Sequence, residues 1–294
     1  KLHGGGLDLE VIVVDNASTD GSPDMVRESF PETVLVLSEK NLGFAGGNNL
    51  GIRKANGRYI LLLNSDAYLL PGVLEATLAF MDRTADCGVL GVKLIGEDGE
   101  MQPCARKLPS PWLKLIVISG LAAKFPRSKF WGGPDHSWWD HGAPRDVGWV
   151  PGAYFLIRRD VVDAIGGMDE RYFLYFEETD YCLQAVRAGW RVMIFPEVSV
   201  IHLGGESSKT GNQAMSVKGK QILKYQFQSE FKYYRKNFGV FRVAAAAGAE
   251  VFWNMVVIVK NTVCRGPNSS QKIQNARSLI ALISQTLRDG RWGR

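Results

Sequence analysis

The sequence predicts an α/β protein whose mostly parallel sheet is layered between helices, and three observations support this fold class. Short β-branched and apolar runs, such as 59–63, alternate with segments of helical periodicity. These runs are apolar throughout, which is typical of strands that helices cover on both faces. The 294 residues are 46% hydrophobic and 22% charged, a composition that allows a large buried core.

Turn and capping residues define the elements in chain order. The strand at 10–14 ends at Asp15-Asn16, and the following turn leads into a helix with Ser22 as N-cap and Pro23 as its first residue. Because apolar runs and helical patterns continue to alternate, we expect strands at 33–37, 59–63 and 88–95 and helices at 45–55 and 71–83.

A stretch without clear periodicity, from 96 to 148, is rich in Pro, Gly and Trp and predicts a loop-rich functional segment. Its tryptophans are candidates to line an acceptor site, although a Trp is more often simply packed. These are Trp131, Trp138, Trp139 and, just beyond the stretch, Trp149. We then expect strands at 154–158, 191–195 and 198–202 and helices at 159–165 and 178–188.

Acidic residues stand at two strand ends and at one helix start. Asp15 and Asp66 follow apolar strands, which is where ligands of parallel sheets bind. Glu177, Glu178 and Asp180 lie within four residues, and such a cluster near apolar surface is costly unless it binds a cation or handles protons. The alternative is that these acids only complement the dipole in the first turn of a helix.

A divalent cation site is one chemistry that these residues share. Asp66 is the candidate anchor among hard oxygen ligands, and His202, at the end of the last strand, is a candidate to complete the coordination sphere. A strand-end His is also commonly just a hydrogen-bonded surface residue. The cluster at 177–180 would supply a separate carboxylate as general base.

Five segments form an ordered set of motifs. They are 13–22 (VVDNASTDGS), 41–49 (NLGFAGGNN), 63–67 (LNSDA), 166–180 (GGMDERYFLYFEETD) and 200–205 (VIHLGG). Together they resemble family 2 glycosyltransferases, and within them the rhamnosyltransferase-like branch, over roughly residues 9 to 206. The resemblance implies a GT-A nucleotide-diphospho-sugar transferase fold and sugar transfer by a single displacement that inverts the anomeric centre.

The resemblance also assigns donor-binding roles. Asp15, with its neighbour Asn16, would contact the nucleotide base or ribose. Asn48, in the Gly-rich turn, would approach the donor. Ser65 and Asp66 belong to the DxD-type motif, in which Asp66 occupies the position of the last metal-binding acid.

Three further roles concern the metal and the acceptor. His202 matches the family's third contact to a Mg²⁺ or Mn²⁺ ion, and Glu178 matches the catalytic base. Asp180 would orient the acceptor hydroxyls. The chain departs from the family in having Asn64 at the first acid of the metal motif and Glu178 where Asp is commoner. Residues 1–6 do not resemble the strand with which the family normally begins, so we expect an N-terminally short catalytic domain.

The composition of the C-terminal region indicates where in the cell the protein acts. Basic residues are interleaved with aromatic ones from 218 to 238, and 240–259 is apolar with three polar interruptions. This pattern favours an interfacial helix on anionic lipid over a spanning one, with a packed helix as the alternative, and no motif supports nucleic-acid binding. We therefore expect a catalytic domain at 1–206 and a basic, amphipathic helical region at 207–294.

The four cysteines show no CxxC pair, which predicts a reduced, cytoplasmic-side protein. Together with the C-terminal region, this predicts a protein that is peripheral on the inner face of the plasma membrane. The resemblance implies transfer of a sugar, L-rhamnose from its dTDP-activated form or another hexose from a nucleotide-diphospho-sugar, to a glycan or lipid-linked acceptor in cell-envelope polysaccharide synthesis. Two alternatives stay open: a catalytically silent nucleotide-sugar-binding scaffold or fragment, and a nucleotidyltransferase.

Overall fold

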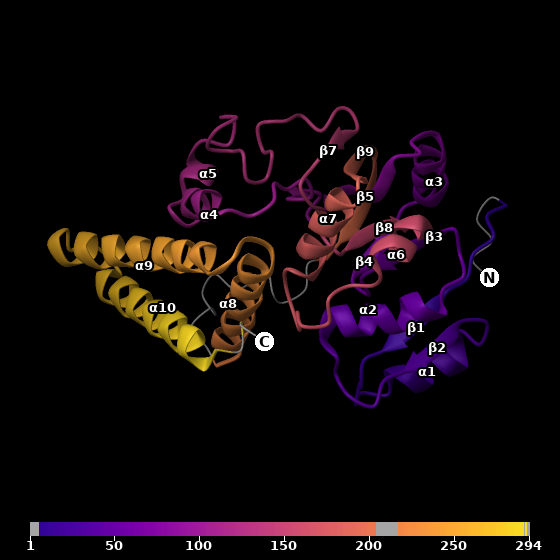
Figure 1. Cartoon of the computed structure of the whole chain (residues 1–294), viewed down its shortest axis with the longest axis horizontal. Helices are drawn as coiled ribbons and strands as arrows, with labels where there is room; N and C mark the ends of the chain where they lie inside the picture. The colour runs from indigo at the N-terminus through magenta and orange to yellow at the C-terminus, as the bar shows by residue number, and fades with distance from the viewer. Residues whose placement is uncertain (1–5, 204–216, 291, 293–294) are drawn as a thin grey trace. The chain divides into compact units, whose positions relative to one another are not determined.

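The computed structural model describes residues 6–203, 217–290 and 292, and the chain divides into two compact units. The first unit, Lys1–Arg106 with His141–Leu203, is an α/β domain, and the second, Lys107–Asp140 with Gly204–Arg294, is helical (Figure 1). The predicted fold class, α/β with a C-terminal helical extension, is confirmed. The predicted features at residues 1–5 and at Gly204 and Gly205 lie outside the described residues.

A small parallel sheet opens the first unit. It consists of β1 (Ile12–Asp15) and β2 (Val34–Leu37), connected through helix α1 (Ser22–Ser29). Helix α2 (Gly43–Lys54) packs against β1. Each of these elements lies within two residues of its predicted position, because turn residues mark their ends clearly.

The larger sheet has the strand order β3-β8-β5-β9-β4, with β6 added to β5 and β7 to β9. Its strands are β3 (Tyr59–Leu63), β4 (Ala67–Leu69), β5 (Cys87–Ile95), β6 (Met101–Gln102), β7 (Arg145–Asp146), β8 (Tyr154–Arg158) and β9 (Arg191–His202), and its helices are α3 (Val73–Arg83), α6 (Arg159–Ile165) and α7 (Glu177–Arg187). The central pair β5–β9 is parallel, whereas β8 runs antiparallel to β3 and β5 and β4 runs antiparallel to β9. The sheet therefore combines parallel and antiparallel strand pairs. An antiparallel neighbour can join a sheet without a helical crossover.

Strand β9 unites the two strands that the sequence predicts at 191–195 and 198–202. Phe195 pairs with Val92, but Ser199 pairs with the next residue, Lys93, so the strand is irregular between them. Pro196 lies in this irregularity, where a strand needs no backbone N–H donor. On α3, Phe80 stacks on Phe195 with ring centroids 4.8 Å apart, which closes the core over the sheet.

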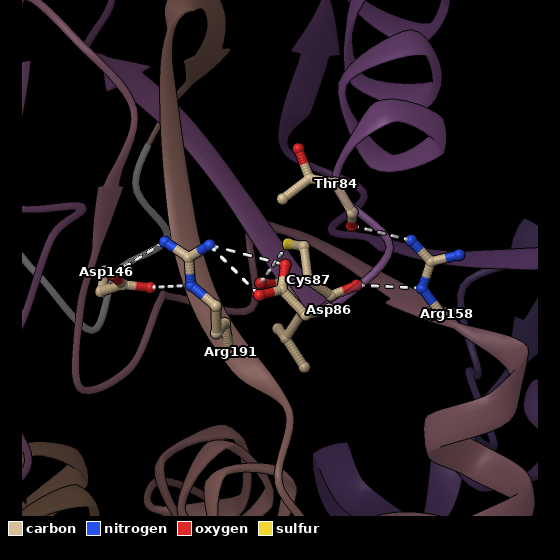
Figure 2. Close-up of polar contacts among 7 residues, drawn as sticks. Thr84, Asp86, Cys87, Asp146, Arg158 and Arg191 are labelled. Carbon is tan, nitrogen blue, oxygen red and sulfur yellow. Dashed lines mark hydrogen bonds and ion pairs between the residues drawn. The ribbon is translucent and has the colours of Figure 1, made fainter.

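Two arginines hold the start of β5 in place (Figure 2). Arg191 lies between two carboxylates, with Nε 2.7 Å from Asp146 Oδ1 and Nη1 3.4 Å from Asp86 Oδ2. Arg158 donates from Nε to the carbonyl oxygen of Cys87 at 3.0 Å and from Nη2 to that of Thr84 at 3.1 Å. These contacts join strands β8 and β9 to the loop between α3 and β5. They lie at the opposite end of β9 from His202, which belongs to the predicted site.

The second unit contains α4 (Pro111–Ile118), α5 (Leu121–Lys124), α8 (Val217–Phe238), α9 (Val240–Val263) and α10 (Ser269–Asp289). Helices α4 and α5 correct the loop-rich prediction for 96–148. The start of α4 is marked in the sequence, since the Ser110 hydroxyl caps the helix by accepting from the backbone N–H of Leu113 at 3.2 Å. Its eight residues are too few and too uniformly apolar to show helical periodicity. The aromatics of α8 form this unit's core, and Phe227, Phe231, Tyr233 and Tyr234 are buried.

Candidate active site

Strand pairing brings together the two residues proposed as metal contacts. In the β4–β9 ladder Ala67 lies opposite His202, and Leu203 donates its backbone N–H to the carbonyl oxygen of Asp66 at 3.0 Å. As a result His202 Nε2 lies 3.4 Å from Asp66 Oδ1, with both side chains partly buried. The structure thus brings these two side chains together, and their role as metal contacts stays a prediction.

Gln102 fixes the ring of His202 from the other side. Its Oε1 lies 2.8 Å from His202 Nδ1, and its Nε2 donates to the carbonyl oxygen of His202 at 2.8 Å. Since an amide oxygen can only accept, this contact requires a proton on Nδ1. In the neutral imidazole, the lone pair of Nε2 is then directed toward Asp66. Sequence reasoning missed Gln102, because a two-residue strand carries no periodicity.

The donor-side residues shape a turn. The Asn16 amide accepts from the backbone N–H of Leu42 at 2.8 Å and donates to the carbonyl oxygen of Gly43 at 3.0 Å. The carboxylate of Asp15 accepts from the backbone N–H of Ser18 at 3.1 Å. The Asn48 side chain donates to the Phe44 carbonyl within α2 at 2.9 Å. The structure thus accounts for the amides of Asn16 and Asn48 as local structural groups, and their contact with a donor stays a prediction.

The Gly-rich turn packs directly on the segment that leads to the acid cluster. Phe44 donates its backbone N–H to the carbonyl oxygen of Phe173 at 2.9 Å. Gly43 has a φ of 73°, and a Cβ there would collide with that same carbonyl, so glycine is required. Asn49 is buried and donates to the carbonyl oxygen of Met168 at 2.7 Å. Two motifs about 120 residues apart therefore form one surface.

The acid cluster begins at a strained backbone. Tyr175 and Phe176, two consecutive non-glycine residues, have φ values of 69° immediately before α7. Each residue in this left-handed region costs about 1 kcal/mol or more, and such outliers concentrate at functional sites. The strain starts α7 at Glu177, so that Glu177 and Glu178 occupy its first turn. The sequence predicts the acids but not the bend that orients them.

Burial, rather than solvent exposure, characterises these carboxyls. Burial raises the pKa of Glu178, and burial together with the charge of Glu178 raises the pKa of Glu177 well above its ordinary value. Within the described residues, Oε2 of each is buried without a hydrogen-bond partner. Asp180 is buried too and accepts from the Gln184 amide at 3.3 Å. Acids that only complemented a helix dipole would face water, so the cluster is more than a solvated helix start.

Arg106 is a residue near Glu178 that sequence reasoning missed. Its guanidinium lies 4.8 Å from the ring centroid of Trp149, and its positive charge counteracts the effect of burial on the pKa of Glu178. Trp149 belongs to the first unit, whereas Trp131, Trp138 and Trp139 belong to the second. The structure therefore does not group the four tryptophans proposed for an acceptor site into one compact unit.

The segment Gly152–Ala153 connects the parts of the site. A backbone hydrogen bond from Gly152 favours the ionised form of Glu178, and the carbonyl oxygen of Ala153 accepts from the backbone N–H of Asn64 at 3.3 Å. A Cβ at Gly152 would lie 2.7 Å from Cζ of Phe44, so only glycine allows this close approach. The acid cluster, the metal motif and the Gly-rich turn all reach the same two residues. Ser65 is exposed beside Asp66.

Comparison with known proteins gives the family. Residues 2–124 match the model described as glycosyl transferase family 2, and residues 142–221 match the model described as glycosyltransferase like family 2. Each match contains motifs on which the resemblance rests. The chain belongs to glycosyltransferase family 2.

Curated relatives agree with this assignment. An N-acetylglucosaminyl-diphospho-decaprenol L-rhamnosyltransferase of Mycobacterium tuberculosis is 29% identical over 212 residues, which are 66% of this chain and 66% of that protein. A hexosyltransferase of low-salt glycan biosynthesis from Haloferax volcanii is 25% identical over 66% of this chain and 58% of that protein. The matched region thus spans two thirds or less of these relatives.

A solved structure with a similar chain path is the mannosyltransferase PcManGT from Pyrobaculum calidifontis, determined with GDP-Man and Mn²⁺. It is 18% identical with a TM-score of 0.49, and the alignment covers 95% of this chain and 78% of that one.

Proposed function

We propose that this chain is an inverting glycosyltransferase that moves a sugar from a nucleotide-diphospho-sugar to a hydroxyl of a glycan or lipid-linked acceptor. The observation that carries the proposal is the buried carboxyl of Glu178, presented by a strained turn and joined through Gly152–Ala153 to the strand end that bears Asp66. Membership of glycosyltransferase family 2 supports the reaction class.

Glu178 acts as the general base. In its ionised form it takes the proton from the acceptor hydroxyl while the hydroxyl oxygen attacks the anomeric carbon, and the nucleoside diphosphate leaves from the opposite face. A single displacement of this kind inverts the anomeric centre. Asp180, two residues further on in α7, orients the acceptor, and Asp15, Asn16, Asn48 and Ser65 bind the donor.

Asp66 and His202 suit a divalent cation. One carboxylate and one neutral imidazole nitrogen, the latter oriented by Gln102, are appropriate ligands for Mg²⁺ or Mn²⁺. Among the residues described, no cluster of three or more His, Cys, Asp or Glu side chains lies within reach of one ion, so the diphosphate and water would complete the sphere. When bound, the ion would neutralise the charge on the departing diphosphate.

The relatives and the composition of the chain support a proposal for the donor sugar and for the location in the cell. We propose L-rhamnose from dTDP-rhamnose as the sugar, because the relative from Mycobacterium tuberculosis is an L-rhamnosyltransferase with a polyprenyl-diphosphate acceptor in its name. Such an acceptor would be met at a membrane. We therefore propose cell-envelope polysaccharide synthesis on the cytoplasmic side, with the enzyme peripheral on the inner face of the plasma membrane.

Thermal shift with a panel of nucleotide-sugars tests donor binding. We expect one donor class to stabilise the chain in Mn²⁺ or Mg²⁺ and to lose that effect in chelator, because ligand binding to the folded state raises the melting temperature. Stabilisation by a nucleoside triphosphate, but by no nucleotide-sugar, would instead favour the nucleotidyltransferase alternative.

Replacement of Gln102 by Leu should weaken metal binding. The variant loses both hydrogen bonds to His202, and loss of an outer partner of a metal-binding His costs about 10- to 100-fold in metal affinity. The measurement is Mn²⁺ affinity, by titration in the presence of nucleoside diphosphate. Gln102→Glu is the control, since it keeps an acceptor for Nδ1 and should lose less. Equal affinity of Gln102→Leu and wild type would disprove this positioning role.

Replacement of Arg106 by Gln should shift the acidic limb of the pH–kcat/KM profile to higher pH. Burial raises the pKa of Glu178 and the charge of Arg106 opposes this rise, so loss of that charge raises the pKa further and more base is protonated at a given pH. Arg106→Lys keeps the charge and should move the limb less. A limb that stays in place, or moves to lower pH, in the Gln variant would refute the assignment of Glu178 as the titrating base.

A further inference from the structure

Helix α9 exposes large apolar side chains although it buries two polar ones. Its buried face consists of the small or apolar Val243, Ala246 and Ala247 together with Glu250 and Asn254. Its exposed face carries large apolar side chains, which we call the outer stripe: Phe241, Phe252, Met255, Val259 and Val263. Phe241 is 87% exposed and Val263 75% exposed. A surface helix in water normally turns such residues inward and its charged residues outward.

The outer stripe is one continuous face. At about 100° per residue, its five members fall within an arc of about 80°. The helix has 24 residues and a mean hydropathy of 1.5 over its most apolar window, so by length and composition it could cross a membrane. Exposed apolar stripes of this extent mark contact with another protein or with lipid.

The acidic residues of helices α8 to α10 are paired with lysines. Lys114 Nζ lies 2.5 Å from Glu230 Oε2 and 3.1 Å from Glu250 Oε1, and all three side chains are largely buried. Asp289 pairs with Lys224 at 3.1 Å. These are the three acidic residues of 217–290, a stretch that also holds twelve Lys and Arg. Each acid is therefore engaged with a lysine.

Basic residues of α9 and α10 remain exposed. Arg242 and Lys260 lie on α9 itself, and Arg265 follows in the connection to α10. Lys272 and Arg277 are exposed on α10. A partner of this surface must accept apolar side chains and carry negative charge. A second copy of the chain would oppose two surfaces of the same sign, and a nucleic acid would leave the outer stripe in water.

We propose that the outer stripe of α9 binds an anionic lipid bilayer, inserting at the boundary between head groups and acyl chains while the flanking basic residues contact the lipid phosphates. Helix α9 lies in the plane of the interface rather than across the bilayer, because the ionic cluster of Lys114, Glu230 and Glu250 on its inner side would be costly within the hydrocarbon. The proposal names the residues that would carry the membrane association predicted from the sequence. It does not depend on the proposed reaction.

Vesicle sedimentation of the full chain tests the proposal. Phe252→Ser/Met255→Ser should lower partitioning onto phosphatidylcholine vesicles with about one third phosphatidylglycerol by at least about tenfold, because two apolar side chains are lost from the contact. The matched control is Met25→Ser/Phe30→Ser, which removes one Met and one Phe of similar exposure from the first unit. The control should partition like wild type. Equal partitioning of wild type and the α9 variant would overturn the proposal.

Four further measurements separate the contributions of charge, depth of insertion and self-association. Lys260→Glu/Arg265→Glu should also reduce binding, and wild type should bind pure phosphatidylcholine weakly, whereas strong binding to neutral vesicles would contradict the role of charge. Alkaline carbonate should release the protein, and retention would contradict an in-plane helix. Sedimentation without lipid should show that the outer stripe does not join two copies, and a dimer that Phe252→Ser/Met255→Ser dissociates would overturn lipid as the occupant.

Discussion

Replacement of Glu178 by Gln should lower kcat by about 10²- to 10⁴-fold, the usual contribution of a general base. The amide has nearly the same size as the carboxyl but cannot take the proton from the acceptor hydroxyl. Donor affinity should change little, because the residue acts on the acceptor side of the reaction. Steady-state kinetics of nucleoside diphosphate release, with donor titration by calorimetry, measures both quantities on the same preparation.

The neighbouring acid provides the control. Glu177 is buried at the same helix start, and burial together with the charge of Glu178 keeps its pKa high. Since burial and the charge of Glu178 favour the neutral form of Glu177, Glu177→Gln introduces a neutral group of nearly the same size and should retain activity within a few-fold. An active Glu178→Gln enzyme beside an inactive Glu177→Gln enzyme would reassign the base to Glu177.

Stability distinguishes a catalytic defect from a folding defect in Glu178→Gln. Burial raises the pKa of Glu178 in the folded chain above the ordinary value of a glutamate, so the folded state binds more protons than the unfolded state between the unfolded-state and folded-state pKa values. Stability of the wild type therefore falls as pH rises through this range, and the Gln variant lacks that loss. We expect the variant to melt at a higher temperature than wild type, with a difference that grows as pH rises above about 5.

Replacement of Asp66 by Ala should reduce kcat/KM by about 10²-fold or more, because a metal that neutralises a leaving diphosphate contributes several kcal/mol to the transition state. Donor affinity in Mn²⁺ should fall toward the value of wild type in chelator. The fold should survive, since the backbone contact from Leu203 to the Asp66 carbonyl does not involve the side chain. Titration of Mn²⁺, followed by electron paramagnetic resonance, reports the lost site directly.

Asp86→Ala is the matched control for Asp66. Like Asp66, Asp86 directly precedes a strand of the larger sheet, but its side chain is 60% exposed and its ion pair with Arg191 lies at the opposite end of β9 from His202. Exposed pairs of this kind contribute about 1 kcal/mol or less. Full Mn²⁺ affinity in Asp66→Ala would remove the proposed metal site, whatever its effect on turnover.

Much of the fold could be predicted because apolar runs and turn residues coincide. Strand β3 and helix α6 end where the sequence predicts, since Asn64-Ser65-Asp66 follows β3 and Gly166-Gly167 follows α6. Strand β8 also has its predicted bounds. The direction of β8 could not be predicted, because strand composition does not encode which neighbour a strand selects. The helices α4 and α5 were missed because they are short and lie among Pro, Gly and Trp.

The candidate site, too, could be predicted only in part. Asp66, His202 and Glu178 stand at element ends within motifs, so their chemistry could be predicted from the sequence. Gln102 lies in the two-residue strand β6 and Arg106 lies outside the named strands, so strand pairing and the path of the loop bring them to the site. The left-handed backbone at 175–176 also has no sequence signal, since Tyr and Phe disfavour it and the surrounding structure imposes it.

The central claim, that this chain transfers sugar from a metal-bound nucleotide-sugar, is tested most directly by release of nucleoside diphosphate. The assay presents a panel of donors, dTDP-rhamnose included, with Mn²⁺, with Mg²⁺ and with chelator. We predict slow release from one donor class that requires the divalent ion and is lost in Glu178→Gln. Metal-dependent donor binding without any release, in the presence of acceptor lipids or glycans, would contradict the claim and identify a nucleotide-sugar-binding protein without catalysis.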